Sequence, residues 1–102
     1  MLVNRRVFVA KPVQSGKMKE MLIALFEVNP WPGGTVRVYT SHIGPFNHVV
    51  VEHESENLAA YEEQVAQFER NFPEGMLDSF LELESSGYHE MWTLAYEKRH
   101  KK

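Results

Sequence analysis

The feature that most constrains this chain is the stretch Thr35–Glu54, which has the pattern of an antiparallel β-hairpin. Two runs rich in β-branched residues, Thr35–His42 and Asn47–Glu54, flank the segment Ile43-Gly44-Pro45-Phe46. β-branched residues favour strands, whereas glycine and proline are typical of turns. The stretch therefore predicts a strand, a short loop and a second strand.

The two faces of this hairpin differ, because side chains alternate along a strand. A four-residue loop predicts one face that is mostly valine, with the pairs His42–Asn47, Thr40–Val49, Val38–Val51 and Val36–His53. The other face is polar and partly aromatic, with the pairs Ser41–His48, Tyr39–Val50 and Arg37–Glu52. A small error in the loop would change the pairs but not the two faces.

The rest of the chain supplies further strands and helices, which we locate from hydrophobic periodicity and from turn residues. The predicted elements are a strand over Asn4–Lys11, a helix between Ser15 and Asn29, a helix over Glu56–Phe72 capped by Ser55, a short helix within Gly75–Glu84, a turn at Ser85-Ser86-Gly87 and a last strand over Tyr88–Glu97. This order predicts an α+β fold, a ferredoxin-like βαββαβ sandwich with a four-stranded antiparallel sheet.

Length and composition indicate one domain over residues 1–102, with a short basic tail at 98–102. Hydrophobic residues make up 43% of the chain, which is enough for a core. No window holds the roughly 20 apolar residues needed to cross a bilayer, and the N-terminal segment lacks the pattern of a signal peptide. With no cysteine and a net charge of −3, we expect a cytoplasmic protein without a nucleic-acid or membrane partner.

Two helices can cover only one face of such a sheet. We expect the valine face of the hairpin, together with Val7 and Val9 of the first strand, to lie beneath the helices. The open face would then carry Arg6, Phe8, Tyr39, Ser41, His48, Val50 and Glu52. Because large exposed apolar patches usually mark an interaction site, we expect a homodimer whose two sheets enclose a partly polar interior.

The segment SHIGPFNHVVVEHE runs directly into SENLAAYEE. With the proline-ended first strand, the SGK start of the first helix and the aromatic last strand, it resembles the NIPSNAP-like family of the dimeric α/β-barrel superfamily. The resemblance implies a ferredoxin-like protomer that dimerises through its sheet into an α/β barrel. It implies no single reaction, because members of this branch mostly lack an assigned activity and the superfamily includes cofactor-independent monooxygenases, haem-handling proteins, isomerases and binding proteins.

Two histidines are candidate catalytic residues, since histidine exchanges protons near neutral pH. His42 and Asn47 flank the loop near a mouth of the predicted barrel, where they would hold a polar substrate or simply face solvent. His48 lies with Ser41 on the predicted cavity face, one pair from Tyr39. These side chains suit proton transfer and a polar network at the dimer interface equally well.

The open face also supplies candidate ligand-binding residues. These candidates are Arg6, Phe8, Arg37, Tyr39, Ser41, Asn47, Val50 and Glu52. Arg37 and Glu52 form either a cross-strand ion pair or a site for a carboxylate. Trp92 and Tyr96 line a pocket for a flat ligand or belong to the core.

We expect no bound metal and no cofactor. His48 and His53 point to opposite faces of one strand, and the histidines lack a metal-binding spacing. The paired glycines at 33 and 34 precede a strand and not a helix, which argues against a phosphate-binding loop.

Three functions fit the sequence. The first is a NIPSNAP-like dimeric α/β-barrel protein, of unassigned activity, that binds a small, partly apolar molecule in a cavity between the sheets. The second is a cofactor-independent monooxygenase or isomerase on the same scaffold, with His48 or His42 as proton acceptor and Tyr39 or Arg37 orienting an oxyanion. The third is a purely structural dimer whose interior is filled by Phe8, Tyr39 and Trp92. The sequence does not choose between an enzyme and a binding protein.

Overall fold

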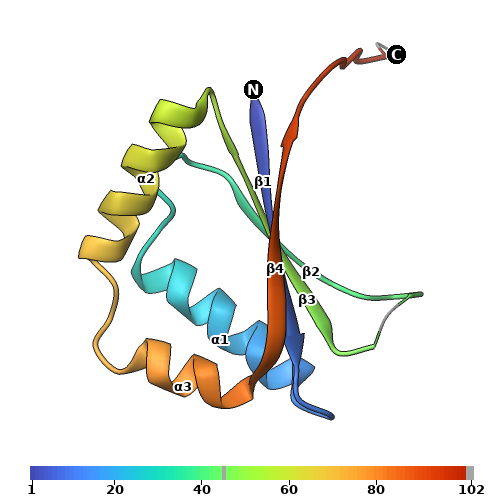
Figure 1. Ribbon diagram of the computed structural model, residues 1–102, viewed down its shortest axis with the longest axis vertical. Helices are drawn as coiled ribbons and strands as arrows, with labels where there is room; N and C mark the ends of the chain where they lie inside the picture. Colours follow the sequence, from blue (N-terminus) through green and yellow to red (C-terminus); the bar gives the residue numbers. More distant parts are fainter. Residues whose placement is uncertain (45, 101–102) are drawn as a thin grey trace.

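Four antiparallel strands and three helices form two layers in the computed structural model, which describes residues 1–44 and 46–100. The elements are β1 (Leu2–Ala10), α1 (Ser15–Val28), β2 (Val36–Thr40), β3 (His48–Ser55), α2 (Leu58–Arg70), α3 (Met76–Leu83) and β4 (Glu84–Thr93). The strands are ordered β2-β3-β1-β4, and all three helices lie on one face of the sheet (Figure 1). The predicted ferredoxin-like α+β fold is confirmed.

The hairpin has the predicted register along the whole of β2. The pairs are Val36–His53, Arg37–Glu52, Val38–Val51, Tyr39–Val50 and Thr40–Val49. The two pairs predicted beyond them are wrong, because β2 ends at Thr40 and β3 begins at His48. The carbonyl of Asn47 instead accepts a hydrogen bond from the backbone N–H of Ala10 (2.8 Å), so the chain before β3 is attached to β1.

The face assignment of the first strand is wrong. Arg6 pairs with Val51 and Phe8 with Val49, and these valines lie beneath the helices, so Arg6 and Phe8 face the helices too. Val7 and Val9 point to the open face. Each face of β1 carries an arginine as well as apolar residues, so packing decides between them. The ring of Phe8 meets the ring of Phe80 in α3 edge to face, at 4.9 Å between centroids.

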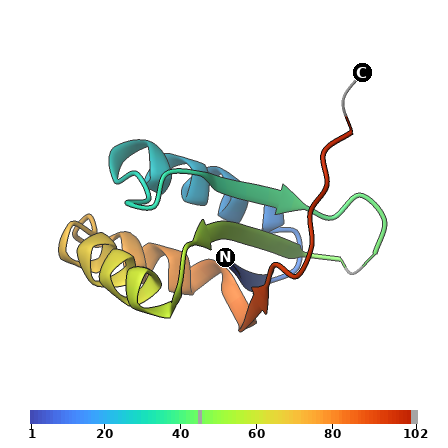
Figure 2. The same cartoon turned by 90° about the horizontal axis from the view of Figure 1, so that it is seen from above.

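The helix-covered face of the sheet contains the core. Met18 and Leu22 of α1 are buried, and they pack with Val49 and Val51 of β3. Leu83, at the end of α3, closes the cluster next to Ala10. Figure 2 shows the helices on this face and the opposite face uncovered.

Three local predictions differ from the structure. The last strand, predicted to run to Glu97, ends at Thr93. Asn57, and not Ser55, caps α2, because the Asn57 side chain accepts a hydrogen bond from the backbone N–H of Ala60 (2.8 Å). Ser55 ends β3 and donates to Gln64 at 2.6 Å. The predicted turn at 85–87 is part of β4, because the backbone there pairs with β1 through Val9–Ser86 and Phe8–Gly87.

The open face has one apolar row and one charged row of side chains across all four strands. The apolar row is Tyr39, Val50, Val7 and Tyr88, and the charged row is Arg37, Glu52, Arg5 and Glu90. The charges alternate in sign from strand to strand. Two salt bridges lie along the charged row, Arg37–Glu52 at 3.9 Å and Arg5–Glu90 at 3.8 Å.

Some of the predicted features lie outside the described residues. They are Pro45, within the predicted hairpin loop, and Lys101 and Lys102, at the end of the predicted basic tail. Within residues 1–44 and 46–100, no helix has the length and apolar character that a membrane span requires.

Candidate functional site

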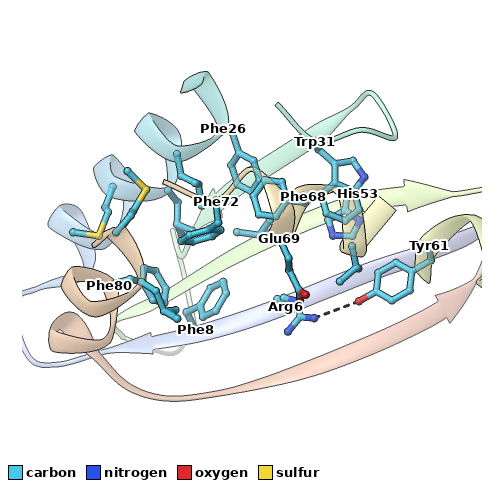
Figure 3. A pocket seen from close by; sticks show the side chains of 17 residues that line it. Arg6, Phe8, Phe26, Trp31, His53, Tyr61, Phe68, Glu69, Phe72 and Phe80 are labelled. Carbon is cyan, nitrogen blue, oxygen red and sulfur yellow. Dashed lines mark hydrogen bonds between the residues drawn. The ribbon is translucent and has the colours of Figure 1, made fainter. Parts of the chain in front are cut away.

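A cavity of about 490 Å³ lies between the helices and the sheet, inside a single chain (Figure 3). Small-molecule sites are typically about 300–1,000 Å³, so the volume suits a ligand of several rings. We predicted from the sequence a cavity on the open face, shared by two copies. That prediction concerns a second chain and stays a prediction, whereas the cavity described here is on the helix-covered face.

Most of the cavity wall is apolar. Phenylalanines come from every side: Phe8 from β1, Phe26 from α1, Phe68 from α2 and Phe80 from α3. Phe26 and Phe68 stack with their ring centroids 5.6 Å apart. The remaining apolar lining residues are Met21, Leu22, Leu25, Val51, Val65, Phe72, Met76 and Leu77. This part of the cavity has the character of a site for a flat or branched apolar molecule.

The other end of the cavity is polar and aromatic. Trp31, from the loop after α1, stacks on His53 of β3 with ring centroids 3.8 Å apart and planes 26° apart. Tyr61 of α2 lies on the other side of His53, at 6.0 Å between centroids. Arg6 donates a hydrogen bond to the Tyr61 hydroxyl at 3.3 Å, as Figure 3 shows.

The sequence folds locally so that Trp31 reaches this end. Pro30 and Pro32 flank Trp31 and restrict the backbone around it. Asn29, which ends α1, is buried and donates its side-chain N–H to the carbonyl of Phe68 at 3.0 Å. The loop is thus tied to α2, and only 6% of Trp31 is exposed.

Asn4 fixes the hydrogen-bond roles of two histidines. Its amide nitrogen lies 2.7 Å from Nε2 of His53, and because an amide nitrogen only donates, this Nε2 must be the acceptor. Its amide oxygen accepts from Nε2 of His89. In its neutral form His53 therefore carries its proton on Nδ1, and neutral His89 leaves Nδ1 with a free lone pair.

Both histidines are held in the neutral form at pH 7. The pKa of His53 is lowered from 6.5 to about 4, mainly because burial disfavours the charged ring and also because the positive charges of Arg6 and His89 oppose a further one. The pKa of His89 is lowered as well, first by burial and then by Arg6. Asn4 and His53 lie beneath the helices and are 1% and 3% exposed.

Two of the predicted ligand-binding residues, Arg6 and Phe8, line this cavity. The other six predicted ligand-binding residues do not line the cavity. Arg37, Tyr39, Val50 and Glu52 are on the open face, and Ser41 and Asn47 lie between β2 and β3. Tyr39 donates to Glu52 at 3.3 Å. The ligand contacts predicted for these six residues stay predictions.

The predicted catalytic histidines lie away from this cavity. His42 is exposed in the segment between β2 and β3. His48 begins β3 on the open face, and its Nδ1 is 2.8 Å from the backbone carbonyl of Phe46. Their catalytic roles stay predictions, and neither histidine contacts the Asn4 network in the part of the chain that the structure describes.

The sequence interpretation missed two residues of the polar end, Trp31 and Tyr61, and the two residues of the adjoining hydrogen-bond network, Asn4 and His89. With the correct face assignment for β1, the sequence would have indicated that Asn4 and His53 are polar residues on the helix-covered face of the sheet. Trp31 gave no signal, because it stands in a segment that only marks the end of a helix. No three His, Asp or Glu side chains among the described residues are grouped closely enough to hold a metal ion.

The fold and the cavity define a ferredoxin-like α+β protein with a ligand-sized site between helices and sheet. No family model matches the chain, and no curated protein matches it. Solved structures do match its fold. An uncharacterized NIPSNAP domain protein from Burkholderia xenovorans superposes with a TM-score of 0.77 at 11% sequence identity, covering 98% of this chain and 100% of that one.

Two further structures are also similar. A protein from Agrobacterium tumefaciens has a TM-score of 0.75 at 19% identity, covering 93% of this chain and 94% of that one. An antibiotic biosynthesis monooxygenase has a TM-score of 0.68 at 17% identity, covering 94% of this chain and 100% of that one. The predicted resemblance to NIPSNAP domain proteins is thus confirmed at the level of the fold, which does not by itself assign a reaction.

Proposed function

We propose that the protein binds a small, mainly apolar molecule in the cavity between its helices and its sheet. The observation that carries this proposal is the cavity of about 490 Å³, apolar along most of its wall and polar at one end. Ligand sites are typically built in this way, with apolar walls for affinity and a few polar groups for orientation.

We also propose that two copies associate through the open face into a homodimer. Tyr39, Tyr88 and Trp92 share this face and are 44%, 55% and 59% exposed. Exposed aromatic groups on one face are typical of an interface. The charged row beside them is already paired within the chain, so a second copy would meet few unpaired charges.

Binding of N-phenyl-1-naphthylamine, an uncharged aromatic dye whose fluorescence rises in apolar surroundings, tests the ligand proposal. Val65 of α2 lines the cavity, and a Val65→Phe variant would fill part of it. We expect this variant to bind the dye at least about tenfold more weakly, because the added ring occupies space that the dye would fill.

The matched control is Ala66→Phe, which adds a ring at the next, exposed position of α2, outside the cavity lining. It should bind the dye like the unmodified protein, and circular dichroism should show both variants folded. Equal dye affinity in the two variants would contradict the proposal.

A second candidate function is a cofactor-independent monooxygenase or isomerase acting on an enolisable aromatic compound. The Asn4 network favours it, because the free Nδ1 lone pair of His89 is a proton acceptor close to Arg6. The fold of an antibiotic biosynthesis monooxygenase is also similar to that of this chain. A positive charge such as Arg6 stabilises an enolate oxygen.

Hydrogen–deuterium exchange at the α-carbon of 1-tetralone tests this candidate without needing an oxidant. An enzyme of this class would accelerate the exchange above the rate in buffer, and His89→Gln would abolish the acceleration. An unchanged rate in the presence of the protein would contradict a proton-abstraction activity on such ketones.

A further inference from the structure

The polar end of the cavity has more hydrogen-bond donors than acceptors. Arg6 supplies N–H groups, and its bond to Tyr61 occupies the hydroxyl oxygen, which leaves the Tyr61 proton available. Two buried N–H groups, Trp31 Nε1 and His53 Nδ1, have no hydrogen-bond partner among the described residues. Both of these atoms are closed off from the cavity space, so the donors that a ligand in the cavity meets are the guanidinium of Arg6 and the hydroxyl of Tyr61.

The positive charge at the polar end of the cavity also favours a ligand with oxygen acceptors. Arg6 forms no salt bridge in the described part of the chain, although its neighbour Arg5 and the more distant Arg37 both do. His53 and His89 stay neutral beside it. Glu69 is the one carboxylate among the described residues that line the cavity. An arginine without a carboxylate partner at the end of an apolar cavity is a typical binding group for an anion.

We infer that the ligand of this cavity is an apolar carboxylate, with its ring or branched body among the phenylalanines and its carboxylate at Arg6 and Tyr61. The inference rests on the proposed binding function and adds the chemical class of the ligand. A guanidinium and a hydroxyl supply two donors to the two carboxylate oxygens.

The test compares 2-naphthoate with its uncharged amide, 2-naphthamide, as competitors that displace the neutral dye. The two compounds share their ring system and differ in charge at one end. We expect the carboxylate to bind at least about tenfold more tightly, which is the effect of one charge-assisted hydrogen bond. Arg6→Gln should remove most of this difference and leave the affinity for the amide nearly unchanged.

Arg5→Gln is the matched control, since it removes the same charge from the adjacent residue of β1, on the open face. It should keep the preference for the carboxylate. Glu69→Gln provides an independent measurement, because removing the negative charge from the cavity should tighten binding of 2-naphthoate and not of 2-naphthamide.

The outcomes separate this inference from the proposed function. If the dye binds in the cavity but the amide competes as well as the carboxylate, or Arg5→Gln and Arg6→Gln have equal effects, the inference is wrong and the binding function stands. If the dye does not bind, or binds equally to the Val65→Phe and Ala66→Phe variants, the binding function itself is wrong.

Discussion

The two faces of the sheet contain similar residues in different surroundings. Each face has at least one valine from β3 and an arginine from β1, yet one face encloses a cavity. The helices leave the other face open (Figure 2). On the covered face Arg6 has a hydroxyl as its partner, whereas on the open face Arg5 has a carboxylate. We therefore propose a ligand site on the covered face, where the exposed Arg6 has no salt bridge among the described residues, and an interface on the open face, where the charges are paired.

The largest expected effect is a loss of folding stability when the core of the covered face is changed. Met18 is fully buried at the centre of the covered face, and Met18→Ala should lower the free energy of unfolding by about 3 kcal/mol, because the core cannot collapse fully around the lost atoms. Ile23→Ala, on the same helix but 40% exposed, should cost less than about 1 kcal/mol. Urea unfolding measures both, and similar losses would contradict the assigned core.

The next largest expected effect is a loss of folding stability at low pH, which comes from His53 on the covered face. Because the folded pKa of His53 is about 4 and the ordinary value is 6.5, the unfolded chain takes up a proton first as the pH falls. The stabilisation that comes from neutral His53 in the folded state is therefore complete above pH 6.5 and is lost as the pH falls toward 4. Between pH 7 and pH 5 we expect a loss of about 2 kcal/mol from this group.

Urea unfolding at the two pH values measures this loss, with His53→Gln as the comparison. The variant should show a smaller decrease between pH 7 and pH 5 than the unmodified protein. If both proteins lose the same stability over this interval, His53 is not held neutral by the fold.

A substitution on the open face should distinguish the proposed interface from the cavity, because it should weaken dimerisation without weakening dye binding. Tyr88→Arg places a charge in the apolar row of the open face and should weaken dimerisation at least about tenfold, as measured by sedimentation velocity. Its control is Leu81→Arg, which changes an exposed residue of α3 on the helix layer. Binding of the neutral dye should survive in the Tyr88→Arg variant, because the cavity lies within one chain; loss of dye binding together with the dimer would place the site between two copies.

The smallest effect concerns the charged row. Arg37 is exposed and bridges Glu52 at 3.9 Å and Glu54 at 3.6 Å. Exposed pairs contribute little, so Arg37→Gln should change the free energy of unfolding by less than about 0.5 kcal/mol. A loss above 1 kcal/mol at high salt would show that this row has a structural role that surface ion pairs do not have.

The faces of the hairpin were predictable because side chains alternate along a strand, and the predicted position of the loop gave the correct pairs along β2, such as Val38 opposite Val51. The first strand was not predictable, because Val7 and Phe8 are both apolar and only packing against α3 distinguishes them. The cavity of the covered face was missed for the same reason, because Arg6 and Phe8, which line it, were assigned to the open face. Trp31 reaches His53 only through the folded loop, which no local pattern encodes.

Adjacent valines of β3 provide the most direct test of whether ligands bind on the covered face of the sheet, as we propose. Val51 lines the cavity, whereas Val50 belongs to the open face. In methyl-labelled protein titrated with N-phenyl-1-naphthylamine, we predict nuclear Overhauser effects from the dye to Val51 and Val65 and none to Val50 or Val7. Contacts to Val50 and Val7, without contacts to Val51, would contradict the account and place the ligand between two sheets.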